Sequence, residues 1–150
     1  MAIVKHSSSK NARYEDVLEY YTCRHQEDSR TGYYAPILDK YGLMQPRSDC
    51  AALYLTADGT AAAPERWASA CRRTNLCYSK NNKPSDRKSH EYILSHPAAD
   101  RGKLSMDDLV EEGRAFSKAF LQGYDCLIAV HRDTDNDHIH ISINSVRAKA

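Results

Sequence analysis

The chain has 150 residues, of which 41% are hydrophobic and 27% are charged. This length and composition predict one soluble domain with an apolar core of its own. The sequence has no apolar run of the roughly 20 residues that cross a bilayer, and residues 1–6 lack the longer apolar stretch of a secretory signal. We therefore expect a cytoplasmic protein without membrane insertion. The net charge of +1 argues neither for nor against an anionic partner.

The cysteines are irregularly spaced and include no CxxC pair, which is the spacing typical of structural zinc sites. An odd number of cysteines also fits a disulfide framework poorly, so we expect reduced thiols. The five positions are Cys23, Cys50, Cys71, Cys77 and Cys126.

The N-terminal part of the chain predicts a strand followed by a helix. We expect the strand over residues 2–6, and then a helix that is capped by Ser9 or Asn11 and runs to about Cys23. Residues 24–49 are polar and contain several glycines and prolines, which is typical of a long excursion from the sheet, that is, an extended loop with a small hairpin.

The middle of the chain predicts a second helix and a further strand. Residues 50–57 fit either a helix or a strand. Pro64 suits a first helical turn, and we predict that this helix continues to about Thr74. A polar loop over residues 81–85 then leads to a strand over residues 90–95.

The C-terminal part carries the clearest predicted helix and two strands. Ser105 and Asp108 have the spacing of a capping box, apolar residues follow at helical spacing, and Gly123 suits the end of the helix. An apolar strand over residues 125–130 and an alternating strand over residues 138–146 are joined by a short polar turn. These two strands should pair antiparallel. The whole order predicts an α+β fold.

Positive charges gather between residues 66 and 88, where Asp86 is the one acidic residue and where Trp67 and Tyr78 also lie. Clustered cations attract phosphates, and aromatic faces can stack on bases, so this segment is a candidate for DNA binding. The alternative is an ordinary solvated helix face and loop. The candidate DNA contacts are Arg72, Arg73, Lys80, Lys83, Arg87 and Lys88.

Three histidines near the C-terminus carry the strongest chemical signal. His138 and His140 alternate with isoleucines on the predicted last strand, so both lie on its polar face together with Ser142 and Asn144. His131 ends the preceding strand, and hairpin pairing would bring it beside them. Three imidazoles on two adjacent strands predict a metal site with open coordination positions.

The turn between these strands adds carboxylates at Asp133, Asp135 and Asp137. One of them could orient an imidazole through its second nitrogen, and another could act as a base. Imidazole suits Mn²⁺, Zn²⁺ and other transition metals, whereas Mg²⁺ prefers oxygen ligands, so the histidines leave the metal open. The alternative is a chance cluster of histidines on an amphipathic strand.

Three segments together resemble a known family. The run His131-x-Asp-Thr-Asp-Asn-x-His138-Ile-His140-Ile-x-Ile-Asn144 resembles the third motif of the MobP-type relaxases, which are HUH endonucleases of plasmids and conjugative transposons. Residues 90–95 (His-Glu-Tyr-Ile-Leu-Ser) resemble the second-motif strand, although a histidine follows where an aromatic residue is expected. Residues 16–22 (Asp-Val-Leu-Glu-Tyr-Tyr-Thr) resemble the first motif, which supplies the nucleophile.

The resemblance implies a ferredoxin-like or palm arrangement, in which helices pack on a central antiparallel sheet. It also implies metal-dependent, site- and strand-specific nicking at an origin of transfer, through a covalent 5′-phosphotyrosine intermediate that starts conjugative mobilisation. The implied cofactor is a divalent metal, Mn²⁺ or Mg²⁺ or another transition metal, held by the three histidines. The implied partners are single-stranded origin DNA, an accessory origin-binding protein and a secretion coupling protein. Residues 1–150 would be one relaxase domain that lacks the C-terminal elements of longer relaxases.

Tyr20 and Tyr21 are the candidate nucleophiles, and they lie about 100° apart around the predicted helix. Tyr21 follows Val17 by four residues and Leu18 by three, so we expect Tyr21 to face the core and Tyr20 to meet a substrate. The family motif has its tyrosine followed by a hydrophobic residue, which also favours Tyr20 and leaves Tyr21 as the alternative. We expect Asp133 to orient a metal ligand or to receive the tyrosine proton.

Further DNA contacts are expected at Ser95, His90 and Asn144. Two other functions stay open at this point. An HUH replication-initiator nuclease would have its tyrosine after the histidines, and no tyrosine follows Tyr124. The second alternative is a fragment that binds origin DNA without cutting it.

Overall fold

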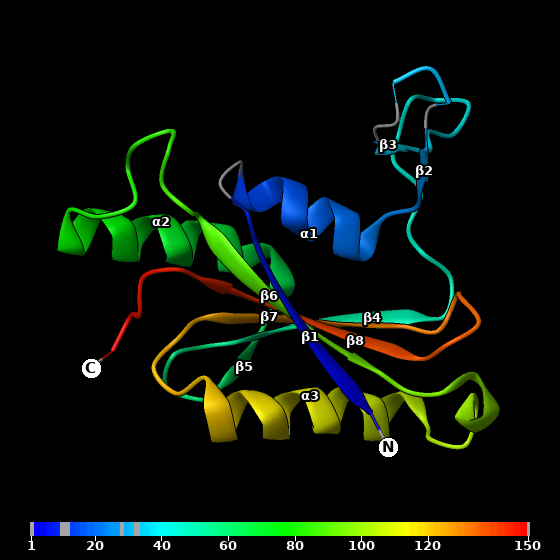
Figure 1. Ribbon diagram of the computed structural model, residues 1–150. Helices are drawn as coiled ribbons and strands as arrows, with labels where there is room; N and C mark the ends of the chain where they lie inside the picture. Colours follow the sequence, from blue (N-terminus) through cyan, green and yellow to red (C-terminus); the bar gives the residue numbers. More distant parts are fainter. Residues whose placement is uncertain (1, 10–12, 28, 32–33, 150) are drawn as a thin grey trace.

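A six-stranded sheet forms the middle layer of the computed structural model, which describes residues 2–9, 13–27, 29–31 and 34–149 (Figure 1). Each pair of neighbouring strands is antiparallel. In spatial order the strands are β1 (Ile3–Ser9), β6 (Ser89–Ser95), β8 (His138–Asn144), β7 (Cys126–His131), β4 (Cys50–Leu55) and β5 (Ala61–Ala62).

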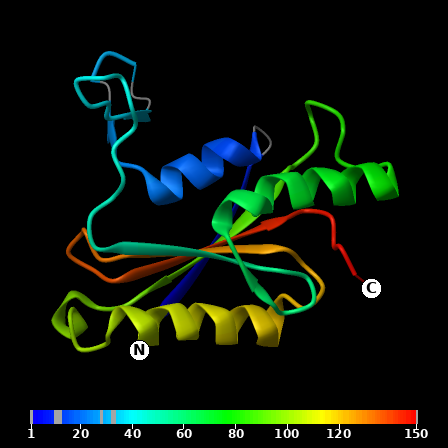
Figure 2. The same ribbon diagram turned by 180° about the vertical axis from the view of Figure 1, so that it is seen from behind.

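Helices cover both faces of this sheet. α1 (Tyr14–Thr22) and α2 (Trp67–Tyr78) lie on one face, and α3 (Met106–Phe120) lies on the other (Figures 1 and 2). The prediction of an α+β fold with helices packed on a central antiparallel sheet is therefore confirmed. Two short 3-10 turns, η1 (Pro64–Arg66) and η2 (Ala98–Asp100), precede α2 and α3.

The alternation of β8 separates two environments, as predicted. Ile139, Ile141 and Ile143 are buried in one apolar cluster with Leu109 of α3. The opposite face of the strand carries the polar side chains and lies toward α1 and α2, whose own cluster is centred on Trp67. The strand therefore supplies the core with one face and a candidate site with the other.

α3 begins and packs as its sequence predicts. Ser105 accepts a hydrogen bond from the Asp108 backbone at 3.1 Å, and the Asp108 carboxylate accepts one from the Ser105 backbone at 3.2 Å. Gly113 lies where the helix crosses the sheet most closely. A Cβ atom at this position would stand 2.8 Å from the Cγ2 of Ile128 and 3.0 Å from the Cγ2 of Ile139, so only glycine fits without a shift.

Several predicted boundaries differ from the structure, among them the end of β8, which is Asn144 instead of residue 146. β1 extends to Ser9 instead of ending at residue 6, because its whole length pairs with β6. α1 begins later, after Arg13, which makes no side-chain cap, so Ser9 belongs to the strand and does not cap the helix. The other proposed cap, Asn11, lies outside the described residues. α2 continues past Thr74 to residue 78 and ends with Ser79 in the left-handed region.

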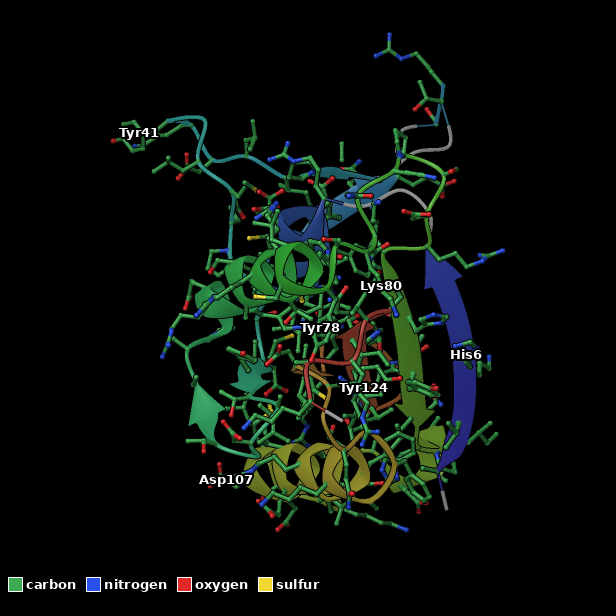
Figure 3. The ribbon with its side chains drawn as sticks, turned by 90° about the vertical axis from the view of Figure 1, so that its left-hand side faces the viewer. His6, Tyr41, Tyr78, Lys80, Asp107 and Tyr124 are labelled. Atoms are coloured by element: carbon green, nitrogen blue, oxygen red, sulfur yellow. The ribbon has the colours of Figure 1, made fainter. Side chains whose placement is uncertain are left out.

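The excursion between α1 and β4 contains the expected small hairpin, β2 (His25–Glu27) paired with β3 (Tyr34–Pro36). Beyond it, Leu38 and Met44 form an isolated bridge, and Tyr41 between them stands away from the body of the molecule (Figure 3). Residues 50–55, which fitted a helix or a strand, form β4. The five cysteines are free, and no helix in the described part of the chain has the length and apolar character to cross a membrane.

Replacing Gly113 by alanine should destabilise the protein. The methyl group gains up to about 1 kcal/mol in helix propensity, whereas overpacking a core costs about 1–3 kcal/mol. The Cγ2 methyls it meets belong to stiff β-branched side chains, so we expect a net loss of about 1–2 kcal/mol in the free energy of unfolding, measured by urea titration. The exposed Ala115→Ser on the same helix is the control and should cost about 0.5 kcal/mol or less. A Gly113→Ala protein more stable than the wild type would contradict the packing described.

Candidate functional site

The structure brings the three predicted histidines together on the α1 face of the sheet. His131 of β7 is the register partner of His138 on β8, and His140 follows two residues later on the same face. The ring centroids of His131 and His140 are 4.5 Å apart, and those of His138 and His140 are 6.0 Å apart. Antiparallel pairing of the two strands thus builds the cluster, as the sequence pattern predicts.

Tyr21, in the last turn of α1, covers this cluster. Its ring centroid lies 5.2 Å from that of His140 and 6.0 Å from that of His131, and only 1% of the residue is exposed. Its hydroxyl donates to the Glu91 carboxylate, so the Ser142 hydroxyl, 2.6 Å away, must be the donor in their contact. Burial, followed by the neighbouring Glu91 charge, raises the pKa of Tyr21 well above its ordinary value.

Tyr20, by contrast, lies at the rim of the site with 39% of its surface exposed. Arg47 holds it there: the Arg47 Nε donates to the Tyr20 carbonyl at 3.0 Å, and the guanidinium carbon lies 5.3 Å from the ring centroid. The His25 ring lies on another side of Tyr20, at a centroid distance of 5.5 Å. The burial of Tyr21 and the exposure of Tyr20 both agree with the helical periodicity in the sequence.

Two carboxylates lie near the site, the predicted Asp133 and one that was not predicted, Glu91. Asp133 forms an ion pair at 3.2 Å with Arg47, the residue that also bonds the Tyr20 carbonyl. None of the hydrogen bonds described for Asp133 is to a histidine, so its expected role in orienting a metal ligand has no support in this arrangement. The carboxylate beside His140 is Glu91 of β6, 3.4 Å from its Nδ1. Burial opposes the ionisation of Glu91, but hydrogen bonds from His140 and Tyr21 outweigh it and lower the pKa of this carboxyl.

Sequence reasoning placed Ser142 on the histidine face without giving it a role, and it missed Glu91 and Arg47. Alternation within β6 would identify Glu91 only once the pairing of β6 with β8 is known, because that pairing places Glu91 opposite Ser142. Arg47 had no local signal, since it precedes β4 in an irregular segment and reaches the site only through the tertiary fold.

Each of the three histidines uses one ring nitrogen in a protein hydrogen bond. His131 donates from Nε2 to the Tyr21 carbonyl at 2.7 Å, because a carbonyl can only accept. His138 donates from Nδ1 to Thr134 at 3.2 Å, since the single hydroxyl proton of Thr134 is given to the Asn136 carbonyl. With His140 donating from Nδ1 to its carboxylate partner, each neutral ring keeps one nitrogen lone pair, which is how metal-binding histidines are usually oriented.

Burial also keeps two of these rings uncharged. Desolvation, followed by the nearby His140, lowers the pKa of His131 to about 4. The same two causes lower the pKa of His138. Neutral imidazole is the form that binds a metal ion, so the donor set fits a divalent transition metal. Among the described residues, however, no group of three His, Cys, Asp or Glu side chains already converges to hold an ion. His131 in particular directs its Nε2 at Tyr21.

The predicted DNA contacts outside the basic segment fall in three different places. Ser95 lies on the histidine face, opposite His138 in the register of β6 and β8. His90 is opposite Ile143 and so lies on the other face, where it stacks on His6 at a centroid distance of 5.2 Å. A contact by His90 with DNA held at the histidine site does not fit this placement.

Asn144 is 1% exposed and belongs to the interior. Its Oδ1 accepts from the Tyr14 hydroxyl at 2.8 Å, and its Nδ2 donates to the Asn75 Oδ1 at 2.8 Å. The amide therefore ties β8 to both α1 and α2, and we leave it out of the proposed DNA contacts.

The basic segment lies on α2 and on the loop of residues 79–88, on the same side of the sheet as the histidines, and Lys80 marks the start of this loop in Figure 3. Arg72 pairs with Glu15 of α1, and the Lys88 Nζ donates to the carbonyls of Asn81 and Lys83, so these two cations also hold the structure together. The remaining candidates are exposed: Arg73, Lys80, Lys83 and Arg87.

His131 should make the stability of the protein depend on pH between about 4 and 6.5. An unfolded imidazole takes up a proton near pH 6.5, whereas the folded residue stays neutral until about pH 4. The unfolded state binds more protons in this window, so the free energy of unfolding should fall as the pH drops through it. In urea titrations with a chelator present, His131→Gln should lose less stability than the wild type over this range. His6→Gln, at an exposed position, is the control, and an unchanged pH dependence in His131→Gln would contradict the burial described.

Comparison with known proteins agrees with the motifs. The sequence matches the relaxase family, described as the MobA/VirD2-like nuclease domain, over residues 45–150. The match includes all three histidines and Glu91, whereas Tyr20 and Tyr21 precede it. No curated protein matches the chain at a significant level.

Members of this family are DNA-nicking endonucleases that act on single-stranded DNA at an origin of transfer, and they generally use a divalent metal. The match spans more than half of the chain, and the sheet that carries the histidines lies largely within the matched residues. The protein therefore belongs to the relaxase family of MobA/VirD2-like nuclease domains.

Proposed function

We propose that this relaxase domain nicks one DNA strand at an origin of transfer through a covalent 5′-phosphotyrosine on Tyr20, in a metal-dependent reaction at the three-histidine cluster. The observation that carries the proposal is the position of Tyr20. It is the exposed tyrosine at the rim of the cluster, and Arg47 holds both its carbonyl and the Asp133 carboxylate.

In the proposed step, the phenolic oxygen of Tyr20 attacks the phosphorus of the scissile phosphodiester. The new oxygen–phosphorus bond forms as the bond from phosphorus to the 3′ oxygen breaks. The phenolic proton passes to Asp133, and the departing 3′ oxygen takes a proton from water to become a hydroxyl. The reverse reaction consumes the 3′-hydroxyl, rejoins the strand and releases the tyrosine.

The hydrogen bonds of Tyr21 favour Tyr20 as the nucleophile. The Tyr21 hydroxyl is enclosed, donates to Glu91 and has a raised pKa, so both access and ionisation work against attack from this residue. Tyr20 is accessible, and the Arg47 guanidinium lies against its ring and bonds its carbonyl, which holds the side chain at the rim of the site. Arg47 is therefore a positioning residue in this proposal.

The metal would be held by His131, His138 and His140. A divalent cation there withdraws negative charge from the non-bridging oxygens of the phosphate. Glu91 orients the His140 ring through its Nδ1, and the Thr134 hydroxyl does the same for His138. His131 keeps its Nδ1 free while its Nε2 is bonded to Tyr21. Mn²⁺ and Mg²⁺ are the cations we propose to test first, before other transition metals.

The wider setting is part of the same proposal. The domain would act in the cytoplasm on a plasmid or conjugative transposon, with an accessory origin-binding protein that presents the DNA and a coupling protein that leads the attached strand to secretion. Exposed cations of the basic segment, Arg73, Lys80, Lys83 and Arg87, and the hydroxyl of Ser95 on the histidine face would contact the strand.

The nucleophile can be identified by trapping the covalent adduct. The purified chain is incubated with Mn²⁺ and a randomised pool of single-stranded 30-mers, and adducts are isolated on a denaturing gel. We expect the adduct in the wild type and in Tyr21→Phe, and its loss in Tyr20→Phe by at least about 1,000-fold, because a covalent nucleophile has no substitute. Mass spectrometry of the tryptic peptide over residues 14–24 locates the modified tyrosine. An adduct that survives Tyr20→Phe and vanishes in Tyr21→Phe would overturn the choice, and a wild type that binds DNA without forming an adduct favours a non-cleaving domain.

The metal site can be tested separately from cleavage by titrating Mn²⁺ into the chain in a calorimeter. His140→Ala should weaken binding by more than about 100-fold, and Glu91→Gln by about 10- to 100-fold, because the carboxylate acts through the ring it orients. His6→Ala removes an exposed histidine on the opposite face and should bind as the wild type does. Equal affinities in His140→Ala and the wild type would place the metal elsewhere.

A further inference from the structure

A cleft of about 480 Å³ opens between the N-terminal end of α1, α2 and the loop of residues 79–88. It lies at the N-terminal end of α1, whereas Tyr21, which covers the histidine cluster, belongs to the last turn of the same helix. Its volume is within the range of small-molecule sites. Neither the proposed nicking step nor the metal site uses it.

The cleft is positively charged at its rim. Its described lining includes Arg13, Arg72, Lys83 and Lys88 and no acidic side chain. Two of these cations are engaged, Arg72 with Glu15 and Lys88 with backbone carbonyls. Arg13 before α1, which interacts with the Glu15 charge, and Lys83 in the loop are both exposed, so their charges can face an anion in the cleft.

The exposed surface of the lining is mostly apolar, although Asn75, Asn81 and Asn82 also belong to it. Leu76 on α2 is 79% exposed, although it lies in the cleft together with Pro84 of the loop and Tyr14 of α1. A single exposed leucine is ordinary on a protein surface. Here it shares a concave site with a proline under a cationic rim, so the site suits a ligand with flat apolar faces and an anionic edge. A nucleotide has both features.

The cleft is formed before any ligand arrives, because hydrogen bonds fix its loop. Asn81 adopts the left-handed region at φ 61°, and its Nδ2 donates to the Tyr14 hydroxyl at 3.1 Å and to the Ser145 hydroxyl at 3.0 Å. Tyr14 is itself bonded to Asn144 of β8. A loop tied to the interior in this way loses little further freedom when it binds, which favours affinity.

We propose that this cleft receives one nucleotide of the single-stranded DNA, with the base against Leu76 and Pro84 and the phosphate near Arg13 and Lys83. The inference deepens the proposed function and rests on it for the identity of the strand. Tyr14 and Tyr20 are six residues apart on α1, about 9 Å along the helix axis. At about 3.4 Å per stacked nucleotide, a strand attached at the tyrosine reaches the cleft within about three nucleotides.

Binding of fluorescein-labelled dT12, followed by anisotropy in a chelator without metal, tests the base contact. Leu76→Ala should weaken binding by up to about tenfold, at the lower end of the range measured when an aromatic side chain that stacks on a base is removed. Alanine preserves the helix, and the circular dichroism spectrum checks this. The matched control is Phe120→Ala, which removes an equally exposed apolar side chain at 72% exposure from α3 on the opposite face, and it should leave the affinity unchanged.

An abasic 12-mer with the same phosphates separates the base from the backbone. Leu76→Ala should not change the affinity for this oligomer, so the preference of the wild type for dT12 should shrink in the variant. Lys83→Ala should weaken binding of both oligomers and lower the slope of log affinity against log salt by about 0.7, as expected for one lost phosphate contact to a single strand. Lys118→Ala on α3 is its exposed control.

Three results would overturn the proposal. The first is that Leu76→Ala has the same affinity for dT12 as Phe120→Ala. The second is that Leu76→Ala weakens the binding of dT12 and of the abasic oligomer equally. The third is that a dodecaglutamate peptide binds with the same dependence on Leu76, which would assign the cleft to an acidic peptide. These measurements involve no metal and no cleavage. If the chain forms no tyrosine adduct, the anisotropy measurements can still confirm nucleotide binding in the cleft. If the chain nicks DNA but Leu76→Ala binds dT12 as the wild type does, only the cleft proposal is refuted.

Discussion

The last turn of α1 is fixed to the sheet through two groups of one residue. The Tyr21 hydroxyl is bonded to Glu91 on β6 and to Ser142 on β8, while the Tyr21 carbonyl accepts from His131 on β7. One helical residue therefore contacts three neighbouring strands. This attachment also fixes the position of the adjacent Tyr20, because the last turn of α1 cannot rotate without breaking the three hydrogen bonds of Tyr21. The same attachment sets the tautomer of His131 and supports the ionised form of Glu91. The position of Tyr20 and the orientation of His131 thus depend on a single buried tyrosine.

The two faces of the sheet differ in character: the α3 face is apolar, and the α1 and α2 face carries the candidate site. The α3 face is a continuous apolar cluster, and the capping box and the close approach at Gly113 hold the helix against it. The α1 and α2 face buries polar groups, among them Asn144, Ser142 and His131. Such groups are tolerated in an interior when their hydrogen bonds are satisfied, and each of these three has named partners. A site of ionisable residues can therefore lie next to the core because the opposite face supplies the apolar packing.

Periodicity predicted those parts of the fold that depend on local pattern. The alternation in β8, the capping box of α3 and the inward face of Tyr21 each follow from spacings of two or of three to four residues. The sequence did not predict contacts that depend on which strands are neighbours. Glu91 reaches the site because β6 pairs with β8 across 42 intervening residues, a pairing that local spacing does not specify. Arg47 reaches it from an irregular segment. The burial of Asn144 was missed for a related reason: alternation assigns a residue to a face but does not show that two helices cover the end of that face.

The order of the strands has a consequence for the synthesis of the chain. β8 lies between β6 and β7, so it joins the β1–β6 pair to the β4, β5 and β7 group, and it is the last strand in the described sequence. Until β8 has left the ribosome, the two halves of the sheet share no edge, and His131 has neither His138 nor His140 beside it. Domains fold as units during translation, and non-local strand pairing is slow. The nascent chain is therefore expected to lack the three-histidine cluster until β8 has been made and has paired with β6 and β7.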